Sequence, residues 1–117
     1  MSYMLLIVEP VGQRDERGLE AGKDAYAEML RFTADLESRG LLEASNSLST
    51  QAKAARVSVR EGQSRIVDGP FAEAREMIGG FFLLKVDTRD EAIEIARRCP
   101  AAAWATVEVR GVGPCYE

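Results

Sequence analysis

Hydrophobic positions form two patterns along the first third of the chain, a continuous apolar run and a repeat at helical spacing, and each pattern predicts one element. Residues 3–9 are apolar on both faces, which is typical of a central strand in a sheet. The polar segment 13–22 predicts a loop. In residues 23–39, apolar side chains recur at helical spacing and Gly40 follows as a stop signal, so we predict a helix there. The apolar positions of this helix are Tyr26, Met29, Leu30, Thr33 and Leu36.

The rest of the chain predicts mainly strands, with one more helix. A short strand is expected at 41–44. Residues 56–60 and 64–68 alternate and are separated by a three-residue turn, which indicates a β-hairpin. A charged helical turn should follow, and then an apolar strand over residues 80–86. Thr88 and Glu91 fit a capping box that begins a helix over 88–99, and residues 104–110 alternate as a last strand.

The order strand, helix, strands, strand, helix, strand predicts a single α+β domain over residues 1–117. We expect ferredoxin-like β-α-β repeats, with an antiparallel sheet and both helices on one face. The other sheet face would then meet a partner subunit or line a wet cavity. The side chains that we expect on this outer face are Tyr3, Leu5, Ile7 and Glu9 of the first strand, and Trp104, Thr106, Glu108 and Arg110 of the last.

Composition narrows the chemistry that this domain can perform. The net charge is −4 and the basic residues are scattered, which argues against a nucleic-acid surface. The chain contains no histidine, which removes histidine-based nucleophilic and acid–base chemistry and most zinc sites. We therefore expect no metal and no organic cofactor. The apolar run near the N-terminus is too short to span a membrane, and we expect a cytoplasmic protein in which Cys99 is a small core residue.

The segment Asp68-Gly69-Pro70-Phe71 is the least ordinary part of the sequence, and two interpretations of it stay open. In the first, Asp68 only shapes a turn, Gly69 permits a positive φ, Pro70 ends the strand and Phe71 anchors the corner. In the second, the Asp68 carboxylate lines a pocket, where nearby acids on a helical turn could make it a base. Those acids are Glu73 and Glu76, with Arg75 as their expected salt-bridge partner.

Several motifs together resemble one known family: YMLLIVE near the start, DGPFAEAREMIGGFFLLKV in the middle, DEAIEIARRCPAA after it, and ATVEVRGV near the end. In these motifs the chain resembles the DGPF-domain branch of the YCII-related family. The resemblance implies a homodimer, in which two ferredoxin-like sheets face each other as a dimeric α+β barrel. It implies little about activity, but it suggests a functional link to a sigma factor of the extracytoplasmic-function class. A cavity between the sheets would also admit a small-molecule ligand.

Two function classes follow from this resemblance and from the residues. The first is a regulatory or sensing domain that binds a small molecule in a cavity between the sheets. The second is a cofactor-independent isomerase or lyase acting on a small cyclic substrate, with Asp68 as base. Some relatives are proposed to use a His–Asp pair, and this chain has no histidine to complete it, which favours the first class. The expected ligand-contacting residues are Asp68, Gly69, Pro70, Phe71, Tyr3, Glu76 and Arg110.

Overall fold

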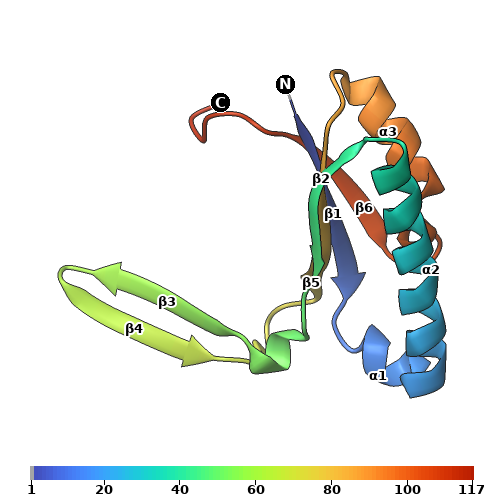
Figure 1. Cartoon of the computed structure of the whole chain (residues 1–117). Helices are drawn as coiled ribbons and strands as arrows, with labels where there is room; N and C mark the ends of the chain where they lie inside the picture. The colour runs from blue at the N-terminus through green and yellow to red at the C-terminus, as the bar shows by residue number, and fades with distance from the viewer. Residues whose placement is uncertain (1) are drawn as a thin grey trace.

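A four-stranded antiparallel sheet, covered on one face by two helices, forms the body of the protein (Figure 1). The computed structural model describes residues 2–117. Strand order in the sheet is β2-β5-β1-β6, and every neighbouring pair is antiparallel. The predicted ferredoxin-like α+β fold is therefore confirmed. The elements of the body are β1 (Tyr3–Pro10), α2 (Leu19–Ser38), β2 (Leu42–Ser47), β5 (Glu76–Leu84), α3 (Arg89–Arg98) and β6 (Thr106–Gly111).

Three short helical segments connect these elements: α1 (Gln13–Arg17), η1 (Gln51–Lys53) and η2 (Pro100–Ala103). The expected loop over residues 13–22 is wrong, because α1 lies within it and α2 begins at Leu19. Gly18, with φ of 84°, separates the two helices. The first turns of α2 are mostly exposed, so they lack the apolar periodicity that identified the rest of the helix.

The hydrophobic core lies between the sheet and the two helices. Leu5, Leu36 and Leu84 are its largest fully buried side chains. Phe32 of α2 meets Phe82 of β5 edge to face, with ring centroids 5.3 Å apart. The other buried members are Ile7, Val86, Ala92, Ile95, Ala96, Cys99 and Ala101. Burial raises the pKa of the Cys99 thiol, and its predicted role as a small core residue is confirmed.

The expected face of β1 is wrong. Leu5 and Ile7 are buried in the core, and they pair with Val109 and Val107 of β6, which pack on the same helix side. Both faces of β1 are apolar, so alternation in the sequence could not say which face the helices would cover. The side chains of β1 that point to the outer sheet face are instead Met4, Leu6 and Val8.

The predicted orientation of the last strand agrees with the structure, except at Trp104, the first residue of the prediction. Thr106, Glu108 and Arg110 are exposed and alternate with the half-buried Val107 and Val109. Trp104 precedes β6, at the end of η2 on the helix side. The outer sheet face is therefore polar along β6 and apolar along the central strands.

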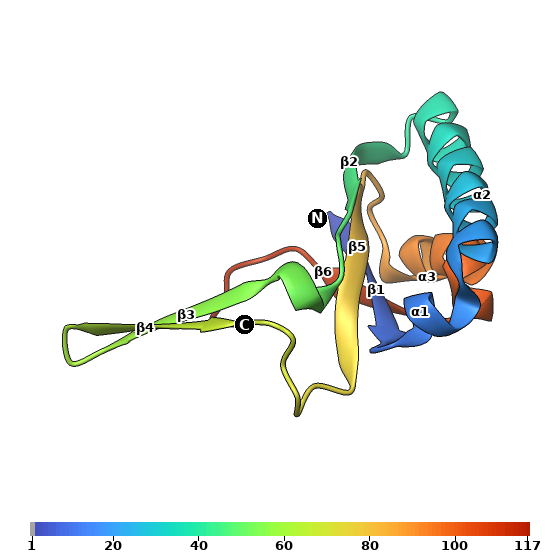
Figure 2. The same ribbon diagram turned by 90° about the horizontal axis from the view of Figure 1, so that it is seen from below.

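The predicted hairpin is confirmed as a separate two-stranded sheet, β3 (Ala55–Arg60) and β4 (Gln63–Asp68). We call it the hairpin arm. Figures 1 and 2 show that the arm projects from the body on the side of the sheet opposite to the helices. Its turn uses positive φ angles, 53° at Glu61 and 79° at Gly62, as a tight hairpin requires.

No helix among residues 2–117 has both the length and the apolar character needed to cross a membrane.

The N-cap of α3 gives a simple test of the fold. The Thr88 hydroxyl accepts a hydrogen bond from the backbone N–H of Glu91 at 3.2 Å. Thr88→Ala should lower the free energy of unfolding by about 1 kcal/mol, because that N–H loses its partner. Thr88→Ser keeps the hydroxyl and should stay close to the parent in urea unfolding. Equal losses in the two variants would show that the cap contributes nothing.

Candidate functional site

A wide cleft opens between the helix layer and the sheet, and we call it the helix-side cleft. Its volume is about 830 Å³, and its walls come from α1, α2, β1, β2, β5 and the residue that follows η2. Tyr26 and Leu30 of α2 line it while remaining about half exposed, at 53% and 50%. Large apolar side chains that stay accessible inside a concave site are typical of small-molecule binding sites.

The floor of the helix-side cleft contains an ion pair between a buried carboxylate and a half-buried arginine. Glu9, near the end of β1, is only 3% exposed, and its Oε1 lies 2.5 Å from Nε of Arg14 in α1. Nη2 of Arg14 also lies 3.5 Å from the carbonyl oxygen of Gly79. An unpaired carboxylate at this depth would be strongly unfavourable, so Arg14 balances the charge of Glu9 and ties α1 to the sheet.

Gly79 is needed for this arrangement. It lies at a register shift in the β1–β5 pairing, between Ile78 and Gly80. A Cβ atom on Gly79 would collide with the Glu9 carboxylate. The sequence predicts a close backbone approach or a bulge at the Gly79-Gly80 pair. In the structure, the Glu9 side chain occupies the space that a Cβ atom on Gly79 would need.

One rim of the helix-side cleft is a stack of Arg17 on Trp104. The guanidinium carbon of Arg17 lies 4.3 Å from the ring centroid, within range of a cation–π interaction. Gln13 supports both residues, since its amide donates to the Trp104 carbonyl and its Oε1 accepts from Arg17 at 3.2 Å. With Lys23 also lining the cleft, three cationic side chains face two carboxylates, Glu9 and Asp15.

The DGPF corner, residues 68–71, has a clear structural role where the hairpin arm joins the body. Asp68 is exposed and pairs with Ala55 at the base of the arm. The backbone N–H of Gly69 donates to the Ala54 carbonyl at 2.7 Å. The expected positive φ at Gly69 is wrong; a Cβ atom there would instead overlap the carbonyl oxygen of Gln51. Glycine is required by close packing of two backbones.

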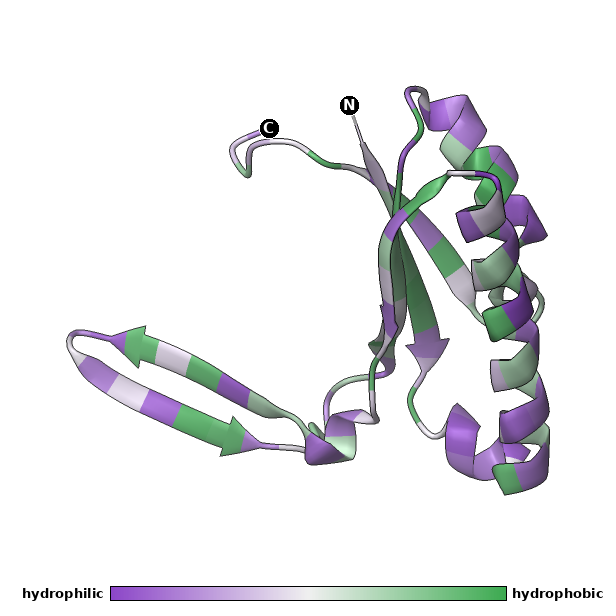
Figure 3. Ribbon diagram, viewed as in Figure 1, coloured by the Kyte–Doolittle hydropathy of each residue, from purple (hydrophilic) through white to green (hydrophobic). Residues whose placement is uncertain are grey.

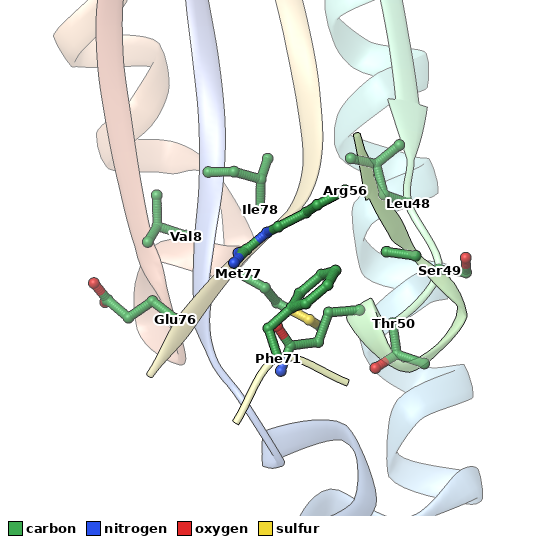
Figure 4. Close-up of a pocket in the computed structure, with 11 residues that line it drawn as sticks. Val8, Leu48, Ser49, Thr50, Arg56, Phe71, Glu76, Met77 and Ile78 are labelled. Carbon is green, nitrogen blue, oxygen red and sulfur yellow. The ribbon is translucent and has the colours of Figure 1, made fainter. Parts of the chain in front are cut away.

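A second hollow of about 510 Å³, which we call the corner pocket, lies between the base of the arm and the outer sheet face. Figure 4 shows the guanidinium of Arg56 over the ring of Phe71, at 3.8 Å from its centroid. Val8 and Ile78 form the wall on the sheet side, and Glu76 lies at the edge.

The structure brings together only some of the predicted site residues. Phe71 and Glu76 line the corner pocket, and the exposed Asp68 lies three residues before Phe71 without lining it. Tyr3 and Arg110 lie at the far end of the sheet, where Tyr3 pairs with Leu84 and Gly111. Tyr3 packs against the core on the helix side, so its expected place on the outer face is wrong.

The charged segment after the corner is also different from the expectation. Glu76 begins β5, and the turn before it is closed by a hydrogen bond from the Ala74 N–H to the Phe71 carbonyl. Glu73 and Glu76 therefore do not share a helical turn. Within residues 2–117, Arg75 has no carboxylate within 4.0 Å, so the salt bridge expected there is wrong. Among the same residues, no three His, Cys, Asp or Glu side chains converge on one point as a metal site would require.

The pairing of Glu9 with Arg14 was not predicted from the sequence. One signal was present, because Glu9 continues the alternation of Leu5 and Ile7 and so shares their face. Once Leu5 and Ile7 are placed in the core, Glu9 must be buried with them and must have a cationic partner. Arg14 lies five residues further along the chain.

Gly69→Ala tests the packing at the DGPF corner. The new methyl group should lower the free energy of unfolding by about 1–3 kcal/mol, because the backbone around Gln51 has to move. Gly22→Ala is the matched control: it lies within α2 with nothing near its Cβ position, and should raise stability by about 0.5–1 kcal/mol. A Gly69→Ala protein as stable as the parent in urea would contradict the close approach.

Arg14→Met tests the ion pair, because it leaves the Glu9 charge buried without its partner. We expect a loss of about 3 kcal/mol in the free energy of unfolding, while Arg14→Met combined with Glu9→Gln should recover much of it. A double-mutant cycle in urea measures the coupling. A coupling near zero would mean that the two side chains do not depend on each other.

The family model described as the YCII-related domain matches residues 1–115. "Uncharacterized protein R00369" of Rhizobium meliloti (strain 1021) is 44% identical over 36 residues, which are 31% of this chain and 29% of that protein. The match therefore spans less than a third of the length of this relative. Because the family model covers almost the whole sequence, the chain belongs to the YCII-related domain family.

Proposed function

We propose that this protein is a regulatory or sensing domain that binds a small molecule in the helix-side cleft. One observation carries the proposal: a buried carboxylate and its arginine lie at the floor of a cleft whose helical wall keeps large apolar side chains accessible. Its volume of about 830 Å³ is within the usual range of ligand sites. Within the YCII-related family we place the chain in the DGPF branch, on the strength of residues 68–71.

The lining of the cleft favours an amphipathic ligand with a negative charge. Tyr26, Leu30 and Met29 offer apolar surface to the body of such a molecule. Arg14 is paired with Glu9, while Arg17 and Lys23 also line the cleft together with Asp15. Lys23 lies 4.0 Å from the carboxylate of Glu20, an exposed pair that is weak in water, so both cations stay accessible to an anion. An aromatic or aliphatic carboxylate or sulfonate would match both properties.

The enzymatic alternative has weaker support in the geometry. A general base must reach the proton that it removes inside a site that holds the substrate. Asp68 is exposed and does not line the corner pocket. Binding without chemistry needs only the cleft, and we therefore favour it.

The single tryptophan of the chain makes the cleft directly observable, because Trp104 lies on its rim. We expect anilinonaphthalene sulfonate, an aromatic anion, to bind saturably and to quench Trp104 fluorescence by energy transfer. Leu30→Glu adds a negative charge to an exposed lining position and should weaken this binding roughly tenfold or more, which corresponds to about 1.4 kcal/mol.

Ala34→Glu is the matched control for this experiment. It adds the same charge one turn further along α2, at an exposed position that does not line the cleft. Its binding curve should match the parent's. Dye that binds parent and Leu30→Glu proteins equally, or binds without quenching Trp104, would place the site elsewhere.

A further inference from the structure

Arg17 brings a positive charge to the rim of the helix-side cleft. It is the last residue of α1, and its half-buried side chain lines the cleft. Within residues 2–117, no carboxylate lies within 4.0 Å of its guanidinium. Arg14 of the same helix also lines the cleft, but it is paired with Glu9. Since the described residues do not balance the charge of Arg17, an anion that enters the cleft can do so.

Two contacts fix the direction of the Arg17 side chain. Its guanidinium carbon lies 4.3 Å from the centroid of the Trp104 ring, and its Nη2 donates to Oε1 of Gln13 at 3.2 Å. Gln13 and Arg17 are four residues apart, so they share one face of α1, which Figure 3 shows as hydrophilic along its whole length. Because the ring and the amide already hold the guanidinium, an anion that binds it orders little further.

Trp104 is a firm support for this guanidinium. Its side chain packs against the hydrophobic core, and its backbone N–H donates to the Ala101 carbonyl at 3.1 Å. Its own carbonyl accepts a hydrogen bond from the Gln13 amide, so Gln13 contacts both members of the stack. The stack uses the face of the guanidinium, whereas the N–H donors lie in its plane. Stacking on Trp104 therefore leaves these donors able to bind an anion.

Lys23 is the less suitable of the two accessible cations. Its side chain is 65% exposed, and it lies 4.0 Å from the carboxylate of Glu20. An ammonium group on a flexible stem is strongly hydrated and has to be ordered when it binds. The planar fork of Arg17 matches two oxygens of a carboxylate or a sulfonate at once. The geometry of the rim therefore favours Arg17.

We propose that Arg17 binds the anionic group of the ligand, an assignment that rests on the function proposed for the same cleft. The ligand is an amphiphile with a carboxylate or sulfonate at one end. Its apolar body lies against Tyr26 and Leu30 of α2, which line the cleft and are about half exposed. A second anionic group would find Arg14 already paired with Glu9, so we expect a monoanion.

Two dyes that differ only in the anionic group test this assignment. Anilinonaphthalene sulfonate carries the sulfonate, and N-phenyl-1-naphthylamine is the same aromatic body without it. Arg17→Met removes the charge but keeps an unbranched stem beside Trp104. It should weaken binding of the sulfonate about tenfold or more, because a charge-assisted hydrogen bond is lost, while the neutral dye binds as it does to the parent. Arg17→Lys keeps the charge without the fork, and its affinity for the sulfonate should lie between the two. Quenching of Trp104 fluorescence gives each dissociation constant.

Arg31→Met is the matched control. It removes the same charge from an exposed position of α2 that does not line the cleft, and both dyes should bind it as they bind the parent. Weaker sulfonate binding in both variants would be an effect of net charge and would overturn the assignment.

Two other results with Arg17→Met would also overturn it. If the variant binds both dyes like the parent, the cleft is a binding site in which Arg17 does not hold the anion. If it loses both dyes equally, Arg17 maintains the shape of the cleft. When the parent itself binds neither dye, the function proposed for the cleft fails, and the assignment of Arg17 fails with it.

Discussion

The covering of a four-stranded sheet on one face only is the constraint on which the rest of the structure depends. Helices α2 and α3 bury the face that carries Leu5, Ile7, Phe82 and Leu84, and the core forms there. An antiparallel sheet can leave its second face to solvent when that face is polar. Here the central strands present Met4, Leu6, Phe81 and Leu83 to the outside, and the hairpin arm, with its own apolar face, projects on that side. The molecule therefore has two open surfaces with different chemistry: an apolar outer face, and a charged cleft beneath the helices.

The sequence predicted the elements well wherever one face of the element is apolar and the other is polar. The hairpin and the last strand from Thr106 onward were predicted correctly because polar and apolar residues alternate in them. In β1 that contrast is missing, so its orientation could only be fixed by pairing: Leu5 with Val109 and Ile7 with Val107. Because the orientation of β1 was not predicted, the burial of Glu9 was not predicted either. Only a buried Glu9 requires a cationic partner such as Arg14. At the DGPF corner, the contact that requires glycine involves the Gln51 carbonyl, eighteen residues earlier in the chain, which no local turn rule would reveal.

The DGPF corner is best understood as the joint between the arm and the body. Asp68 closes the ladder opposite Ala55, and Gly69 packs directly on the backbone at Gln51. Phe71 then turns back to receive the Arg56 guanidinium, which links the end of the motif to the first strand of the arm. Each of these contacts fixes the direction in which the arm leaves the sheet. The residues of this corner, which the sequence also allowed as an active site, can thus be required by geometry alone, since a small change in this joint would move the far end of the arm by much more.

The two open surfaces are separated by the thickness of one strand. Val8 and Glu9 are consecutive in β1, yet Val8 lines the corner pocket and Glu9 lies at the floor of the helix-side cleft, because successive side chains of a strand point to opposite faces. In β5 the two residues at the register shift contact different surfaces. Ile78 lines the corner pocket, and Gly79 lies against the Glu9 carboxylate. A ligand that displaced Glu9 would therefore press on the backbone that carries Val8 and Ile78. The floor of the cleft and the wall of the corner pocket are therefore built on the same stretch of β1 and β5, with Gly79 leaving room only for the Glu9 carboxylate.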